Sequence, residues 1–136
     1  MVEVLAALLV MGVGIVGIAA LYSDEVHTSP EAQLHERAAA FAEQIAERIR
    51  NTKEGRVGFA GTVGVVCTPT TPRRTPQDLA SQEAACWEDA IERDLPSGAG
   101  SVTRDLTTHP ETYVVAVSWS SPETGAATYV IRVSPE

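Results

Sequence analysis

The feature that most constrains this chain is a long uncharged apolar run near its amino terminus. From Val4 to Tyr22 there are 19 residues without a charge, and Glu3 is the only charged residue before them. A helix of that length covers about 28 Å, close to the ~30 Å hydrocarbon core of a bilayer. An acid beside such a segment is costly in lipid and needs a partner. The run predicts a transmembrane or assembly helix over residues 1–22, with Glu3 as its candidate site.

A signal peptide and a buried core helix both fit the run less well. A cleaved signal peptide has a basic start and an apolar core of roughly 7–15 residues, whereas no Lys or Arg precedes Arg37. A helix buried within the domain would need a core thick enough to cover apolar residues on every face, and a chain of this size has none. A plain membrane anchor fits the length of the run but gives Glu3 no role.

The remaining residues, 23–136, have the length of one small domain. The formal net charge of the whole chain is −8, and Arg73 and Arg74 form a pair rather than a basic patch. Because a nucleic-acid surface neutralises phosphates with many Lys and Arg side chains, this composition predicts no nucleic-acid partner. We therefore expect a single globular domain over residues 23–136.

The chain has two cysteines, Cys67 and Cys86, and both follow the apolar run. They are too few for a zinc site made of cysteine alone, and their spacing is not that of a redox CxxC motif. In an exported domain they predict one disulfide that closes a loop of about 20 residues. The alternative is a pair of reduced, buried thiols in a cytoplasmic domain, which the preceding apolar run disfavours.

An amphipathic helix is predicted over about residues 30–52. Ser29 is its expected N-cap, Pro30 its first residue, and Glu31 lies near the positive end of the helix dipole. The polar stretch before Pro30 predicts a kink or short break after the apolar run. Apolar residues recur every three to four positions and form the expected buried stripe: Leu34, Ala38, Phe41, Ile45 and Ile49.

A second helix and an antiparallel sheet are predicted in the carboxy-terminal half. Thr75 is the expected N-cap of the helix, with Pro76 at its first position. Its expected buried side is formed by Leu79, Trp87, Ile91 and Leu95. The segment "YVVAVSW" alternates with a period of two, "SPETGA" is a hairpin connection, and "ATYVIRV" is the partner strand. The segment "GSVTRDL" is a candidate third strand, while the glycine-rich stretch after residue 52 predicts a loop or irregular strand.

Residues that could carry chemistry do not form a recognisable site. The histidines stand apart from one another and from acidic or cysteine clusters, so they predict no metal site: His27, His35 and His109. Glu88, Asp89 and Glu92 are best interpreted as a solvated helix face, and Trp87 and Trp119 as core aromatics. No serine or cysteine lies in a nucleophile motif. We expect no enzyme activity, no cofactor and no small-molecule substrate.

Several segments together resemble the type IV pilins. The opening "VEVLAALLVMGVGIVGIAAL" is similar to the amino-terminal helix of that superfamily, and "AAAFAEQIAERIRN" to the end of its long first helix. "CWEDAIERDLPSGAGSV" and "YVVAVSW" are similar to later segments of the minor pilins called PilV, or pilus-modification proteins. The resemblance covers most of the chain and is patchy between Gly55 and Pro76.

The resemblance implies a fold, a role and a location. The fold is α+β, with a long amino-terminal helix packed on a carboxy-terminal antiparallel sheet. The role is that of a non-catalytic minor pilin that joins other minor pilins to prime pilus assembly at or near the tip, beside the major pilin and a tip adhesin. The location is the inner membrane, with the domain in the periplasm, before assembly. Glu3 matches the glutamate that pairs with the amino terminus of a neighbouring subunit.

The chain departs from the pilin pattern at two places, and two further functions remain open. Only two residues precede Glu3, where the family has four residues of the mature chain and a short leader, so we expect the natural start to lie upstream of Met1. Pro30 falls where the family has a continuous helix. The alternatives are a minor pseudopilin of type II secretion, built on the same plan, and a single-pass anchored periplasmic binding or sensory domain.

Overall fold

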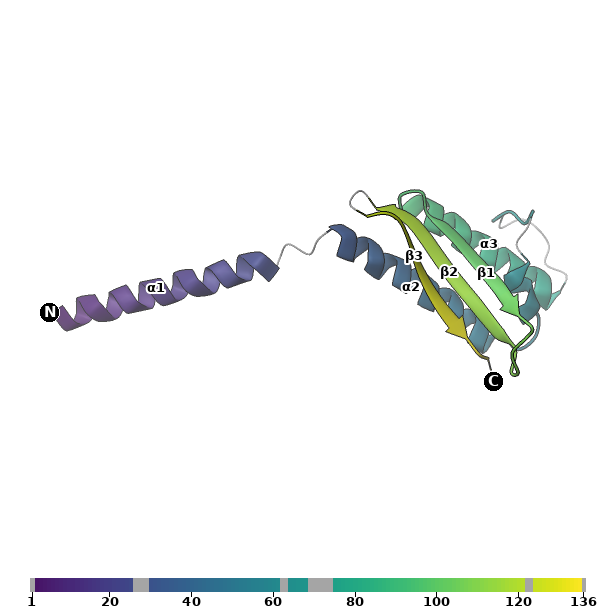
Figure 1. Cartoon of the computed structure of the whole chain (residues 1–136), viewed down its shortest axis with the longest axis horizontal. Coiled ribbons are helices and arrows are strands. Elements are labelled where there is room, and N and C mark those ends of the chain that lie inside the picture. The colour runs from purple at the N-terminus through teal and green to yellow at the C-terminus, as the bar shows by residue number, and fades with distance from the viewer. Residues whose placement is uncertain (1, 26–29, 62–63, 69–74, 122–123, 136) are drawn as a thin grey trace. The chain divides into compact units, whose positions relative to one another are not determined.

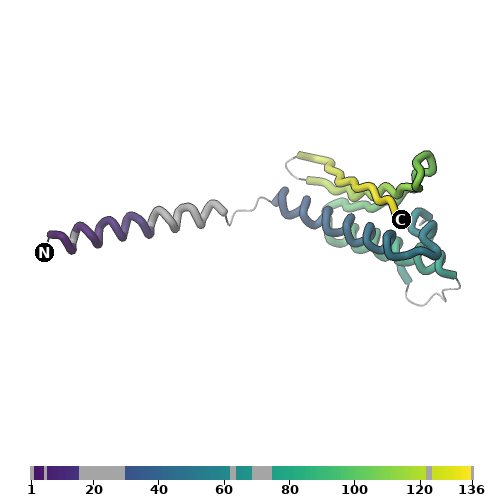
Figure 2. Tube along the Cα trace, turned by 90° about the horizontal axis from the view of Figure 1, so that it is seen from below, coloured from purple at the N-terminus to yellow at the C-terminus, as the bar shows by residue number. Residues whose placement is uncertain are grey.

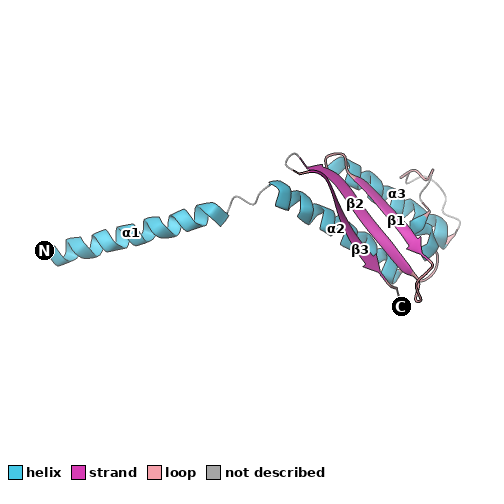
Figure 3. Cartoon of the chain, viewed as in Figure 1, coloured by secondary structure: helices cyan, strands magenta, loops and turns pink. Residues whose placement is uncertain are grey.

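The chain forms two compact units, Met1–Ala32 and Gln33–Glu136. The computed structural model describes the backbone of residues 2–25, 30–61, 64–68, 75–121 and 124–135. All helices precede all strands along the chain, as Figure 3 shows. The elements are α1 (Val2–Glu25), α2 (Pro30–Asn51), η1 (Arg56–Ala60), α3 (Pro76–Asp94), β1 (Ala99–Asp105), β2 (Thr112–Ser121) and β3 (Gly125–Val133).

The first unit is built around α1, a helix of 24 residues. Its side chains are described at positions 2–4 and 6–15, and all of these are exposed. The large apolar ones are Val2, Val4, Leu8, Leu9, Val10, Met11, Val13 and Ile15. Within the part of the chain that the structure describes, no helix is long and apolar enough to cross a membrane.

The second helix, α2, begins at Pro30 as predicted, because proline suits the first turn of a helix. Ser29 and the predicted break before Pro30 lie outside the described residues. The buried stripe is smaller in volume than predicted, since Leu34 and Phe41 are only partly buried. The predicted burial of Ala38, Ile45 and Ile49 is confirmed. Ala42 and Ala46 are buried as well, and their small side chains let neighbouring elements approach closely.

The third helix, α3, begins as its sequence predicts. Thr75 is the N-cap and forms a capping box with Asp78, in which each side chain accepts a hydrogen bond from the other residue's backbone N–H. The prediction that Leu79 lies on the buried side is wrong, because its side chain is 36% exposed. The buried side runs instead through Ala80, Ala84, Trp87 and Ile91.

The reason for this difference is the short 3₁₀ helix η1, which packs against the first turns of α3. Gly58 of η1 lies so close to α3 that an added Cβ would collide with the carbonyl of Gln77. The Ser81 hydroxyl donates a hydrogen bond of 3.0 Å to the Gly58 carbonyl. At such a short separation a small residue, Ala80, must face η1. The segment predicted as a loop or irregular strand therefore forms a 3₁₀ helix and contributes to the core, where Phe59 is 1% exposed.

Strands β1, β2 and β3 form an antiparallel sheet in that order, so all three predicted strands are confirmed. In β2 the side chains alternate as predicted, with Tyr113, Val115, Val117 and Trp119 buried. The β2–β3 register runs from Tyr113 opposite Val133 to Ser121 opposite Gly125 without a bulge. The "SPETGA" connection is described only in part, because residues 122 and 123 lie outside the described residues.

The second unit has two layers, seen edge-on in Figure 2, with the sheet on one side and α2 and α3 on the other. Figure 1 shows both helices behind one face of the sheet, with β2 in the middle. Buried residues from α2, η1, α3 and all three strands form one hydrophobic cluster. The predicted fold class, α+β, is confirmed for this unit.

Candidate functional site

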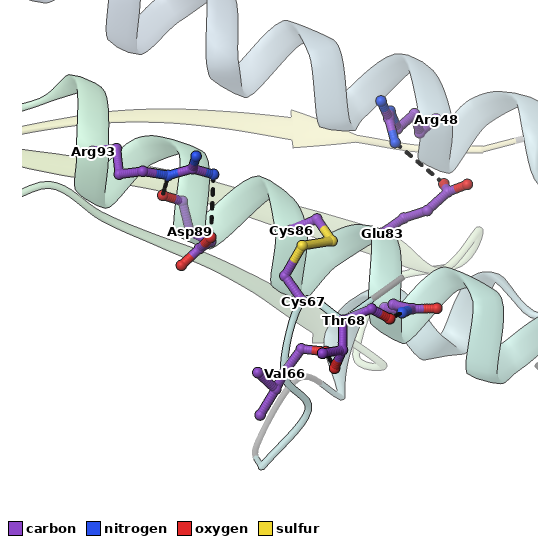
Figure 4. Close-up of a disulfide and its surroundings, with 9 residues drawn as sticks. Arg48, Val66, Cys67, Thr68, Glu83, Cys86, Asp89 and Arg93 are labelled. Atoms are coloured by element: carbon purple, nitrogen blue, oxygen red, sulfur yellow. Dashed lines mark hydrogen bonds and ion pairs between the residues drawn. A yellow bond between two sulfur atoms is a disulfide. The ribbon is translucent and has the colours of Figure 1, made fainter. Parts of the chain in front are cut away.

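Cys67 and Cys86 form a disulfide, as predicted, with their Cα atoms 4.6 Å apart. The bond joins the segment around Cys67 to α3 (Figure 4). Thr68 closes a tight turn around Cys67, since its N–H donates to the Val66 carbonyl at 2.8 Å. The side-chain amide of Gln82 donates to the Thr68 carbonyl. Because Gln82 is buried and lies one turn before Cys86, the disulfide and the amide together fix two consecutive residues, Cys67 and Thr68, on α3.

Helices α2 and α3 are joined by a partly buried hydrogen bond and a surface ion pair. The indole N–H of Trp87 donates to the Phe41 carbonyl at 2.8 Å, which places the largest side chain of α3 against the backbone of α2. The Arg48 guanidinium lies 3.4 Å from the Glu83 carboxylate, and both side chains are more than a third exposed (Figure 4). The exposed pair contributes little, so the indole bond and the core determine how the helices pack.

The carboxyl end of α2 is capped by a side chain from the next element. Arg56 of η1 donates from Nε to the carbonyls of Ile49 and Thr52, each at 2.9 Å, and from Nη2 to that of Arg50 at 3.4 Å. The last carbonyls of a helix have no partner within the helix, and a cation there also opposes the helix dipole. No local sequence signal indicates this role, because the arginine lies outside the helix that it caps.

A cluster of polar residues lies at the end of the sheet farthest from the β2–β3 connection. Arg104 of β1 pairs with Glu111, just before β2, and both are half-buried. The neighbouring Tyr113 is buried, and burial raises the pKa of its hydroxyl, with a further increase from the hydrogen bond and charge of Glu111. Asp105 accepts hydrogen bonds from the hydroxyl and N–H of Thr107, which lower the pKa of its carboxyl.

A cluster of aromatic side chains lies under the end of the sheet nearer the β2–β3 connection. The His35 ring of α2 meets Trp119 and Tyr129 edge-on, with centroids 5.9 and 5.4 Å away. Trp119 and Trp87 are both buried, so their assignment as core aromatics is confirmed. His35 therefore has a packing role that its isolation in the sequence did not indicate. His27 lies outside the described residues, and His109 precedes Pro110 in an exposed turn.

Glu3 lies in the first turn of α1, in the other unit. It lines a shallow surface hollow with Val4, Ala7, Leu8 and Met11, which occupy the same side of the helix at spacings of three and four. Among the described side chains of α1, Glu3 is the charged one and all the others are apolar. The site is thus an exposed carboxylate in an apolar helical surface.

The predicted site residues fall into two separate places, with Glu3 in the first unit and the disulfide in the second. The acidic group on α3 is a surface feature in which Asp89 pairs with Arg93 at 3.1 Å and Glu92 is exposed. Among the described residues, no cluster of His, Cys, Asp and Glu has the arrangement of a metal site. Comparisons with protein-family models, with curated proteins and with solved structures find no match for the chain.

Proposed function

We propose that this chain is a minor pilin of the PilV type, a non-catalytic structural subunit of a type IV pilus. Residues 1–22 hold it in the bacterial inner membrane before assembly, with the second unit in the periplasm. It then joins other minor pilins, primes the filament and comes to lie at or near the tip, beside the major pilin and a tip adhesin. In this plan α1 and α2 are the two halves of the long first helix of a pilin.

The observation that carries the proposal is the contrast between an uncovered apolar helix and a domain that is complete without it. The described side chains of α1 are exposed and apolar apart from Glu3. The buried cluster of the second unit draws on residues from Ala38 to Val133 and includes none of the described side chains of α1. An exposed apolar surface of this extent marks an interaction with lipid or with another protein. A subunit that exchanges a bilayer for a bundle of helices needs such a surface.

Glu3 would set the position of α1 along the neighbouring helices of the bundle. A carboxylate in apolar surroundings is tolerated when a cation neutralises it, and the free amino terminus of a neighbouring helix is such a cation. The pair can form only when the two helices are staggered so that one helix start meets the hollow around Glu3. The carboxylate therefore favours one register of neighbouring subunits over others.

The first experiment compares wild type with Glu3→Leu, Glu3→Gln and Glu3→Asp in the native host. We expect the Leu and Gln variants to accumulate in the inner membrane and to be depleted from sheared filaments by immunoblot, with the Asp variant in between. Trp fluorescence should show unchanged urea unfolding for all three, because Trp87 and Trp119 both lie in the second unit. A Glu3→Leu protein that enters filaments as well as wild type would contradict the assigned role.

The second experiment separates assembly from simple anchoring. Residues 1–22 are replaced by an unrelated transmembrane helix of equal length, and piliation is counted by electron microscopy. The proposal predicts loss of assembly, whereas an anchored binding or sensory domain predicts retained function. Proteins that copurify with wild type then distinguish a pilus from a type II secretion system, in which this chain would be a minor pseudopilin.

A further inference from the structure

We propose that β3 is a self-pairing edge, through which two copies of this chain join their sheets into one six-stranded sheet. The proposal concerns the second unit only and does not depend on the function proposed above. It rests on the open backbone edge of β3, on the incomplete burial of its inner side chains and on the match of its sequence to itself.

The first observation is that β3 is an outer strand of the sheet and carries none of the usual features that block pairing. One of its backbone edges bonds to β2, and the other has no strand beside it among the described residues (Figure 1). Natural edge strands are protected by charged residues, prolines or bulges. β3 has no proline, no bulge against β2 and a single charge, Arg132. β1, the other outer strand, is shorter and carries Arg104 and Asp105.

The second observation is that the helical layer does not fully cover β3. Its residues Ala127, Tyr129 and Ile131 face the same side as buried β2 residues, yet all three are half-exposed. Their direct partners on β2 are Trp119, Val117 and Val115, which are at most 3% exposed. A strand added at the open edge would shield these side chains, so pairing would bury apolar surface as well as satisfying backbone groups.

The third observation selects a second β3 as the added strand. Full antiparallel overlap of two copies of Gly125–Val133 places Tyr129 opposite Tyr129 of the partner subunit. On either side of this centre every pair then combines a smaller residue with a larger one. The pairs are Gly125 with Val133, Ala126 with Arg132, Ala127 with Ile131 and Thr128 with Val130.

This register satisfies the other requirements of a sheet. Paired residues have the same parity, so the inward and outward faces of the two copies coincide. Aromatic and β-branched cross-strand pairs are the favourable kind. The two Arg132 side chains lie six residues apart along the ladder, about 20 Å, beyond the ~8 Å over which exposed charges act at physiological salt. Nothing in the strand therefore repels its copy.

A single pair of strands makes a smaller contact than the roughly 800 Å² a side of a stable complex. We therefore expect a weak dimer that depends on concentration. It would be favoured where copies are held close together.

The test uses the purified full chain in detergent micelles with a photoreactive residue at one of two matched positions. Ala126 on β3 and Ala99 on β1 are both exposed alanines on the outward face, at opposite edges of the sheet. Ala126→p-benzoyl-phenylalanine should give a cross-linked dimer whose linked peptide, by mass spectrometry, is β3 of the second copy near Arg132. Ala99→p-benzoyl-phenylalanine should give none, even if α1 also associates, because α1 contacts would not bring β1 edges together.

The register is tested by two double variants that carry the Ala126 probe. Thr128→Glu with Val130→Glu places like charges opposite each other twice and should lower the dimer yield by about 2- to 30-fold. Thr128→Lys with Val130→Glu places opposite charges there and should restore it. Intact disulfide mass and far-UV circular dichroism show that both remain folded. Equal yields from the two probes, equal yields from the two double variants, or cross-links to another protein would each overturn the proposal.

Discussion

Helices α1 and α2 have similar lengths, 24 and 22 residues, but opposite relations to the rest of the chain. α1 has no charge from Val4 to Tyr22, and its described side chains are exposed. α2 carries charges along its outer side and buries five residues against the sheet and α3. The more apolar helix is therefore the one whose described side chains are exposed.

This difference indicates that the spacing of apolar residues along a helix, rather than their total number, determines which helix is buried within the chain. A helix with one apolar stripe can complete the core of a small domain and still face water. A helix that is apolar on every side has no such solution in a domain of this size, so its cover must come from outside. This is the physical basis for the proposal that α1 acts in assembly, whereas α2 contributes to the core of the second unit.

The largest expected effect on the free energy of unfolding comes from a comparison of one substitution on each helix. Ile45→Ala on α2 should lower the free energy of unfolding by about 2–5 kcal/mol, because Ile45 is fully buried and the truncation leaves a cavity. Leu8→Ala on α1 should change it by less than about 0.5 kcal/mol. Urea unfolding followed by Trp fluorescence reports the second unit alone. Comparable losses from the two variants would remove the distinction.

The disulfide should account for the next largest effect. Cys67→Ser with Cys86→Ser opens a loop of about 20 residues and should lower the free energy of unfolding by about 3 kcal/mol. Val66→Ser at the neighbouring exposed position is the control and should be nearly neutral. The same urea measurement checks both, with intact mass before and after reduction as confirmation of the bond. An unchanged midpoint in the double variant would mean that the bond does not stabilise the fold.

The cap of α2 offers a smaller test. Arg56→Met keeps the apolar stem but leaves the carbonyls of Ile49 and Thr52 without this donor, which should cost about 1–2 kcal/mol. Arg93→Met, which loses an exposed ion pair with Asp89, should cost less than about 0.5 kcal/mol. Hydrogen exchange should also show faster opening of the last turn of α2 in the first variant only. Equal behaviour of the two arginine variants would argue against the cap.

The smallest effect concerns alkaline pH. The raised pKa of Tyr113 means that the folded state holds its proton more tightly than the unfolded chain, which loses it near pH ~10. The contribution of Tyr113 to the stability of the folded state is therefore fully present below that pH and is lost as pH rises through the folded pKa. Tyr113→Phe should flatten this decline in urea unfolding between neutral and strongly alkaline pH.

The sequence by itself determined the elements whose signals are local. Thr75, Pro76 and Asp78 mark the start of α3, because a capping box needs only neighbouring residues. Alternation in β2 determined which of its residues face the core, since strand side chains have a period of two. The disulfide was predictable for a different reason, since the chain has only two cysteines and each can pair only with the other.

Only the tertiary structure decided the features that depend on contacts between distant segments. Leu79 is exposed because η1 packs closely against Ala80, so that Ala80 rather than Leu79 faces the core. η1 lies more than 15 residues earlier in the chain. Arg56 caps α2, Trp87 bonds to the α2 backbone, and His35 packs against two strands from the far end of the chain. The partial exposure of the inner face of β3 likewise depends on where the helical layer ends. None of these has a local pattern, because each depends on which surfaces meet when the layers pack.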